Sequence, residues 1–104
     1  MNKVIRDGLV AILYSPGYGA GWYTWHNIPE LIYDPAVVDM VDKGTDYTDI
    51  IQYCEEKYPS FTKCYSGAED LRISWIKEGR VFLIDEYDGF ESIRFREDID
   101  WLVA

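Results

Sequence analysis

Hydrophobic and polar positions along the chain predict strands toward its two ends and helices between them. Apolar runs at 3–6 and 9–14 flank Asp7-Gly8, a dipeptide typical of a two-residue hairpin turn. The second run is apolar at nearly every position, which indicates a central strand that is covered on both faces. Residues 31–33 could form a further short strand or a packed loop.

Two helices are predicted in the middle of the chain. Asp34 can cap the first helix, which has proline at its first position and a lysine-glycine pair at its end. Thr45 or Asp46 caps the second helix, and Pro59 stops it. Apolar side chains recur along the second helix at the spacing of one buried stripe, at Tyr47, Ile50, Ile51, Cys54 and Tyr58.

After a loop at 60–70, alternating apolar and polar residues predict a three-stranded meander. Its strands are expected at 71–76, 80–87 and 90–95, with Asp88-Gly89 as the second turn. Residues 96–100 are expected to form a charged turn, after which 101–103 could return to the sheet as an edge strand.

The predicted element order is β-β-α-α-β-β-β in a single domain that spans 1–104, a usual domain length. This order favours an α+β fold, a mostly antiparallel sheet with the two short helices packed on one face.

The chain is acidic, with nineteen Asp and Glu against ten Lys and Arg and a formal net charge of −9. This balance argues against direct binding to nucleic acid, which needs a basic face. It suits a basic partner surface, although acidity also serves solubility. Residues 34–56 carry seven carboxylates against Lys43 alone, so the two helices could imitate phosphates, although two of these carboxylates also serve as caps.

No apolar run approaches the roughly 20 residues of a membrane span, and the first residues lack the apolar core of a signal peptide. We therefore expect a cytoplasmic protein with no membrane contact. Cys54 and Cys64 are too few for a disulfide scaffold, and whether they pair stays open. An exposed hairpin edge or aromatic loop could support a homo-oligomer.

The least ordinary segment is 15–26, SPGYGAGWYTWH, with glycines at 17, 19 and 21. A dinucleotide-binding loop needs a helix that opens at the glycines, and the residues that follow do not predict one. The Lys-Ser/Thr pair of a P-loop is also absent. The aromatic side chains could instead stack on a nucleobase or anchor in a partner's groove; the candidate binding residues are Tyr18, Trp22, Tyr23, Trp25 and His26.

The alternative for this segment is that it covers one end of the core. In an extended segment, Trp22 and Thr24 would face one way and Tyr23 and Trp25 the other. One face is then expected to be buried, and the other to be open to a partner.

Arg72 and Arg80 complete the set of candidate binding residues. If they converge near the aromatic segment, they offer a site for an anionic ligand. The alternative for the arginines of the predicted meander is cross-strand pairing with Asp85, Glu86 and Glu91.

No catalytic residue, metal site or cofactor is predicted. His26 is the only histidine, and together with Cys54 and Cys64 it lacks the ligand spacing of structural zinc. Cys54 lies on an apolar stripe, which favours the core. Carboxylates around the last predicted hairpin favour a solvated tip over a catalytic pair or a calcium loop.

Three stretches carry a resemblance to a known group of proteins: KVIRDGLVAILYSPGYGAGWYTW, LIYDPAVVDMV and LRISW…EGRVFLIDEYDGFESI. They resemble a group of short proteins encoded by bacteriophages and prophages, and the likeness covers most of the chain. The group has no established function to transfer to individual residues. The resemblance implies a setting in which small acidic proteins often inhibit host machinery, including antiviral defence.

These observations support three hypotheses. The first is a phage accessory protein, possessing no enzymatic activity, that inhibits a host component by occluding a protein surface or by sequestering a small nucleotide-like ligand. The second is a small enzyme acting on a nucleotide or sugar, with His26, Asp85 and Glu86 as its candidate groups. The third is a structural or assembly part of a phage.

Overall fold

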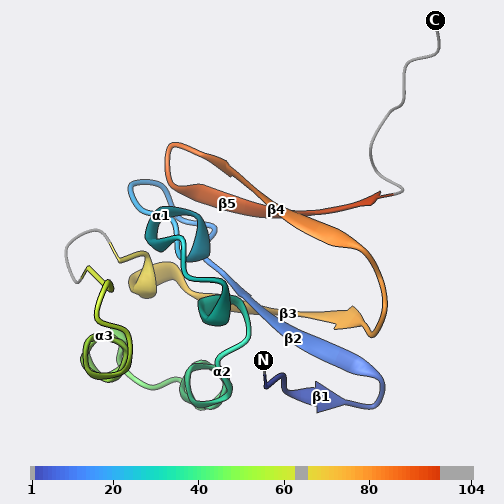
Figure 1. The fold of residues 1–104 in the computed structure, drawn as a ribbon, viewed down its shortest axis with the longest axis horizontal. Helices are drawn as coiled ribbons and strands as arrows, with labels where there is room; N and C mark the ends of the chain where they lie inside the picture. Colours follow the sequence, from blue (N-terminus) through green and yellow to red (C-terminus); the bar gives the residue numbers. More distant parts are fainter. Residues whose placement is uncertain (1, 63–65, 97–104) are drawn as a thin grey trace, which may run out of the picture.

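The structure is a computed structural model that describes residues 2–62 and 66–96. It is an α+β fold with antiparallel strands and two short main helices, which confirms the predicted fold class. Three strands form one sheet in the order β1-β2-β3, and two form a separate hairpin (Figure 1). The strands are β1 (Ile5–Arg6), β2 (Leu9–Tyr14), β3 (Arg72–Lys77), β4 (Phe82–Tyr87) and β5 (Phe90–Phe95).

Strand β2 is the centre of the molecule, as its continuous apolar run predicts. Ala11 and Leu13 face the core that lies under the helices. Val10 and Ile12 face the opposite way, into a second cluster formed with the β4–β5 hairpin. The protein therefore has three layers, with α2 (Pro35–Asp42) and α3 (Tyr47–Lys57) on one side of the β1–β3 sheet and the hairpin on the other (Figure 1).

The last three strands do not form the predicted meander. Strand β3 pairs with β2, whereas β4 pairs with β5 alone in the described part of the chain. The physical reason lies in β2, whose second apolar face needs a cover. Phe82, Ile84, Ile93 and Phe95, on one face of the hairpin, provide it. Both predicted Asp-Gly turns are present, with positive φ at Asp7, Gly8, Asp88 and Gly89.

The two predicted helices are α2 (Pro35–Asp42) and α3 (Tyr47–Lys57), capped by Asp34 and Asp46. Shorter helical turns are α1 (Tyr23–His26), η1 (Pro29–Ile32) and η2 (Ala68–Asp70). Turn η1 replaces the short strand or loop expected at 31–33. The charged turn and edge strand expected near the C-terminus fall largely outside the described residues, as does Cys64. Over 2–62 and 66–96, no helix is long and apolar enough to cross a membrane.

Candidate functional site

The aromatic segment 15–26 bends into a helical turn, so the expected strand-like alternation of its side chains is wrong. Trp22 is completely buried, and its indole N–H donates to the carbonyl oxygen of Leu31 at 2.7 Å. Tyr23 also packs against the core. Tyr18 and Trp25 are 72% and 44% exposed. The segment therefore has one buried side and one exposed side, as expected, but these sides arise from the helical turn α1 and not from a strand.

A buried carboxylate from strand β5 occupies the amides of this segment. Glu91 is fully buried and accepts hydrogen bonds from the backbone N–H of Ser15 (2.8 Å) and of Thr24 (3.0 Å). The Thr24 hydroxyl donates to the same carboxylate at 2.7 Å. Because Glu91 lies at the amino end of α1, the position that an anionic ligand would take already holds a protein carboxylate.

The glycines permit a close approach between this segment and the β4–β5 turn. The Gly19 N–H donates to the Asp88 carbonyl oxygen at 3.0 Å. A Cβ on Gly89 would lie 2.8 Å from the Gly19 carbonyl carbon, and a Cβ on Gly21 would lie 2.7 Å from Trp25. Because Gly19 and Gly89 lack side chains, the tip of the β4–β5 hairpin can lie directly against the aromatic segment. This contact accounts for Gly19 and Gly89, whereas Gly17 lies against the side chain of Asp70 and Gly21 lies against Thr24 and Trp25 of its own segment.

His26 has a structural position beside the segment. Its ring stacks on Phe61 with centroids 4.2 Å apart. Nδ1 accepts the backbone N–H of Thr62 at 3.4 Å, so Nε2 donates to the Ser66 carbonyl oxygen at 3.2 Å. Burial lowers the pKa of His26, opposed in part by the Ser66 hydrogen bond and the charge of Glu91. Both ring nitrogens of His26 therefore have backbone hydrogen-bond partners.

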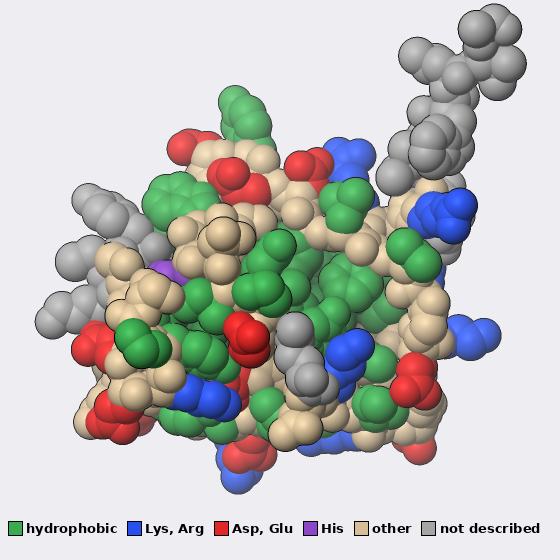
Figure 2. All heavy atoms as spheres, viewed as in Figure 1, with side chains coloured by type: hydrophobic (Ala, Val, Ile, Leu, Met, Phe, Trp, Pro, Cys, Tyr) green, Lys and Arg blue, Asp and Glu red, His purple; other side chains and the backbone are tan. Residues whose placement is uncertain are grey.

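On its open side, the segment borders a hollow of about 310 Å³ between residues 18–20, the start of α3, and residues 66–70. We call it the acidic hollow; its lining includes Tyr18, Tyr47, Ile51, Ser66, Glu69 and Asp70. No Lys, Arg or His is among the described residues that line it. Figure 2 shows Asp and Glu side chains over α3.

Aromatic groups hold two sides of the acidic hollow. The Tyr18 ring rests on Phe90, with centroids 5.0 Å apart. The charge of Glu69, with a hydrogen bond from the Tyr47 hydroxyl to its carboxylate, raises the pKa of Tyr47. The hollow thus combines aromatic faces with carboxylates, a combination that attracts cations. Glu69, Asp70 and Tyr47 were not predicted as site residues, because they come together only in the fold.

The structure does not bring Arg72 and Arg80 together. Arg72 opens β3 opposite Tyr14, whereas Arg80 lies beyond the far end of that strand, with its guanidinium over the Phe95 ring. The alternative of cross-strand pairing holds for Arg94, which forms an ion pair with Asp85 at 3.0 Å.

Asp85 and Glu86, the carboxylates of the enzyme hypothesis, each have a different partner in the structure. Asp85 pairs with Arg94, while Glu86 accepts the backbone N–H of Gly89 at 2.6 Å within the hairpin turn. Neighbouring residues of β4 face opposite sides of the hairpin. His26 contacts neither carboxylate through the hydrogen bonds described above, so these groups have separate structural roles.

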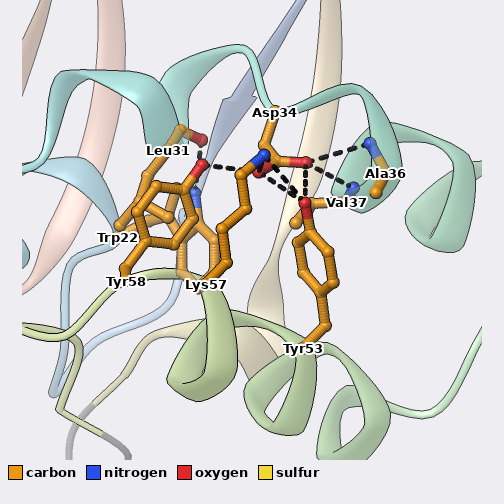
Figure 3. A network of polar contacts seen from close by, with 8 residues as sticks. All are labelled: Trp22, Leu31, Asp34, Ala36, Val37, Tyr53, Lys57 and Tyr58. Carbon is orange, nitrogen blue, oxygen red and sulfur yellow. Dashed lines mark hydrogen bonds and ion pairs between the residues drawn. The ribbon is translucent and has the colours of Figure 1, made fainter.

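Asp34 is the centre of a polar network that the sequence indicated only as a helix cap (Figure 3). Its side chain is buried and accepts hydrogen bonds from Ala36 N (2.9 Å), Val37 N (3.2 Å), Tyr53 OH (3.0 Å), Lys57 Nζ (3.1 Å) and Tyr58 OH (2.5 Å). Desolvation alone would raise the pKa of Asp34, but these bonds outweigh it and lower the pKa. The network ties the start of α2 to the end of α3.

The same network contains no base that is active near neutral pH. Burial raises the pKa of Tyr58, and hydrogen bonds to Tyr53 and Asp34 raise the pKa of Lys57, so both keep their protons. Burial also raises the pKa of the Cys54 thiol to about 12, which makes it unreactive. Within the described ranges, no group of three His, Cys, Asp or Glu side chains could hold a metal ion.

The acidic helices present fewer free carboxylates than their sequence suggests. Asp34 is buried, Asp39 pairs with Lys43 at 2.9 Å, and Asp42 pairs with Arg6 at 3.3 Å. This weakens phosphate imitation along the helices and leaves the acidic hollow as the clearest candidate site. Comparison with family models, with curated proteins and with solved structures finds no match for this chain.

Proposed function

We propose that this protein is a phage accessory protein that binds a basic surface of a host protein at the acidic hollow and blocks that surface without catalysis. The observation that carries the proposal is the lining of the hollow, where exposed tyrosines lie beside Glu69 and Asp70. The phage setting rests on the sequence resemblance.

A Lys or Arg side chain of the partner fits this lining in two ways. Its charge is attracted by the two carboxylates, and its cationic group can lie against the rings of Tyr18 and Tyr47. The net charge of −9 adds long-range attraction toward a basic partner and speeds the encounter at low salt.

Sequestration of a nucleotide at the aromatic segment has less support. A phosphate group would meet Glu69 and Asp70 in the hollow and the carboxylate of Glu91 at the segment's amides. The enzyme hypothesis also lacks support, because His26, Asp85 and Glu86 each have a different structural partner.

The test compares a site variant, Tyr18→Ala/Glu69→Gln, with a matched control, Tyr87→Ala/Glu55→Gln. All four side chains are exposed, and the control pair lies outside the hollow. Each tagged protein is used to capture partners from infected cells, and the captured protein is then purified and titrated by calorimetry.

The expected result is one stoichiometric host protein that the wild type and the control bind alike. The site variant should bind it at least about tenfold more weakly, and added salt should weaken the wild type as well. Equal binding by the site variant contradicts the proposal. Capture of a phage particle protein instead would favour the assembly hypothesis.

A further inference from the structure

A second hollow, of about 160 Å³, opens near the other end of the β1–β3 sheet from the aromatic segment. Val10 and Ile76, which pair across β2 and β3, form its floor. We call it the basic hollow; its walls include Lys3, Tyr33, Lys77, Gly79, Arg80 and Phe82. No Asp or Glu is among its described lining residues, so it has the opposite charge to the acidic hollow.

Two of its cations are not neutralised by carboxylates. Elsewhere, ion pairs join Arg6 to Asp42, Lys43 to Asp39, Lys57 to Asp34 and Arg94 to Asp85. Across residues 2–62 and 66–96, Lys3 and Lys77 have no such pair. Lys3 Nζ instead lies 4.7 Å from the centre of the Tyr33 ring. In a protein of net charge −9, Lys3 and Lys77 therefore form a local excess of positive charge.

Backbone hydrogen bonds hold the turn between Lys77 and Arg80 in place. The Arg80 N–H donates to the Lys77 carbonyl oxygen at 3.0 Å, which closes a turn with Gly79 at φ +88°. The Glu78 N–H donates to the Gly8 carbonyl oxygen at 2.9 Å and fastens this turn to the β1–β2 turn. The Arg80 guanidinium lies 3.4 Å from the centre of the Phe95 ring. A ligand therefore meets Lys77 on a turn whose backbone is already ordered.

We propose that the basic hollow binds the phosphate group of a small phosphate monoester. A phosphate monoester carries about −1.5 to −2 charges at neutral pH, which suits Lys3 and Lys77 acting together. The hollow is smaller than the roughly 300 Å³ at which pockets enclose whole small molecules. It therefore holds the phosphate itself, and the apolar floor contacts only the first atoms of the ester.

The test is a titration of ¹⁵N-labelled protein followed by NMR, with inorganic phosphate in one series and adenosine 5′-monophosphate in the other. Both should cause saturable shifts of the amides of Lys77, Gly79 and Arg80. Lys3→Gln and Lys77→Gln should each weaken binding about tenfold. The control is Lys43→Gln, because Lys43 forms an ion pair with Asp39 of α2 and lies outside the basic hollow. It should leave the affinity unchanged.

Tighter binding of the nucleotide would identify a nucleotide-like ligand, and equal affinity would identify phosphate monoesters in general. The proposal is overturned by shifts that do not saturate, by equal weakening in Lys43→Gln, or by phosphate binding without any nucleotide binding. Unchanged amide dispersion in each variant shows that it is folded. The acidic hollow is not involved, so either proposal can fail without the other.

Discussion

Replacing Glu91 with glutamine keeps the shape of the side chain but removes its charge and half of its accepting capacity. In the wild type, one oxygen accepts the Ser15 N–H, and the other accepts the N–H and hydroxyl of Thr24. Glutamine must turn its NH₂ group toward one of these sets of donors. At least one of the two backbone N–H groups, that of Ser15 or that of Thr24, then loses its acceptor beside a fully buried side chain.

The magnitude follows from these bonds. An orphaned buried donor costs about 1–3 kcal/mol, and the remaining bonds weaken because their acceptor is no longer charged. We therefore expect Glu91→Gln to lower the free energy of unfolding by about 2–4 kcal/mol. With a urea m-value of about 2 kcal/mol/M, the urea midpoint should fall by roughly 1–2 M.

The assay is urea unfolding followed by tryptophan fluorescence, since Trp22 is buried in the core beside this site. Glu56→Gln on the exposed surface of α3 is the control, with an expected change within about 0.5 kcal/mol. If Glu91→Gln were as stable as this control, the claim that the Glu91 carboxylate organises the aromatic segment would be wrong.

Three further predictions concern the same region. Trp22→Ala should lower the free energy of unfolding by about 3–5 kcal/mol, whereas Trp25→Ala, at a side chain 44% exposed, should cost less than about 1.5 kcal/mol; equal losses in urea unfolding would contradict this division. Gly89→Ala and Gly79→Ala both place alanine at positive φ, but only at position 89 does the new Cβ meet backbone atoms. In the same assay, the free energy of unfolding of Gly89→Ala should therefore be lower than that of Gly79→Ala by about 1–3 kcal/mol. Because burial lowers the pKa of His26 in the folded state, the stability that neutral His26 contributes is present above its unfolded pKa of 6.5 and decreases as the pH falls through 6.5 to the folded pKa. Unfolding measured between pH 7.5 and 5.5 should show this loss in the wild type, and the same loss in His26→Gln would assign it to other groups.

Local features of the fold were predictable because their causes lie within a few residues. The Asp7-Gly8 and Asp88-Gly89 turns need only positive φ at adjacent positions. Asp34 and Asp46 cap helices through amides two or three residues away. The apolar run of β2 indicated that both of its faces are covered, and both are.

Long-range features were not predictable from local patterns. Glu91 lies opposite Glu86 near the tip of the hairpin, where a carboxylate is expected to be solvated. It is buried because β5 meets the end of β2, where the Glu91 N–H donates to the Ser15 carbonyl oxygen. The helical turn α1 depends on that same carboxylate at its amino end. The departure of β4 and β5 from the sheet depends on how two apolar faces fit together, which alternation alone does not specify.

The same limit applies to the two hollows. Tyr18 was a candidate from composition, but Tyr47 and Glu69 join it only because α3 and η2 pack beside the glycine loop. Arg80 was a candidate for anion binding, but its neighbours in the structure are Lys3 and Lys77 rather than the aromatic segment.

Site-specific photo-crosslinking during infection tests the central claim most directly. A benzophenone amino acid is placed at Tyr18 or Tyr47, which line the acidic hollow, and at Leu83, which is exposed on β4 and lies outside it. We predict that positions 18 and 47 crosslink to the same host protein and that position 83 does not. Crosslinking from position 83 alone, or none from 18 and 47 in folded protein, would contradict the proposal that the acidic hollow is the binding site.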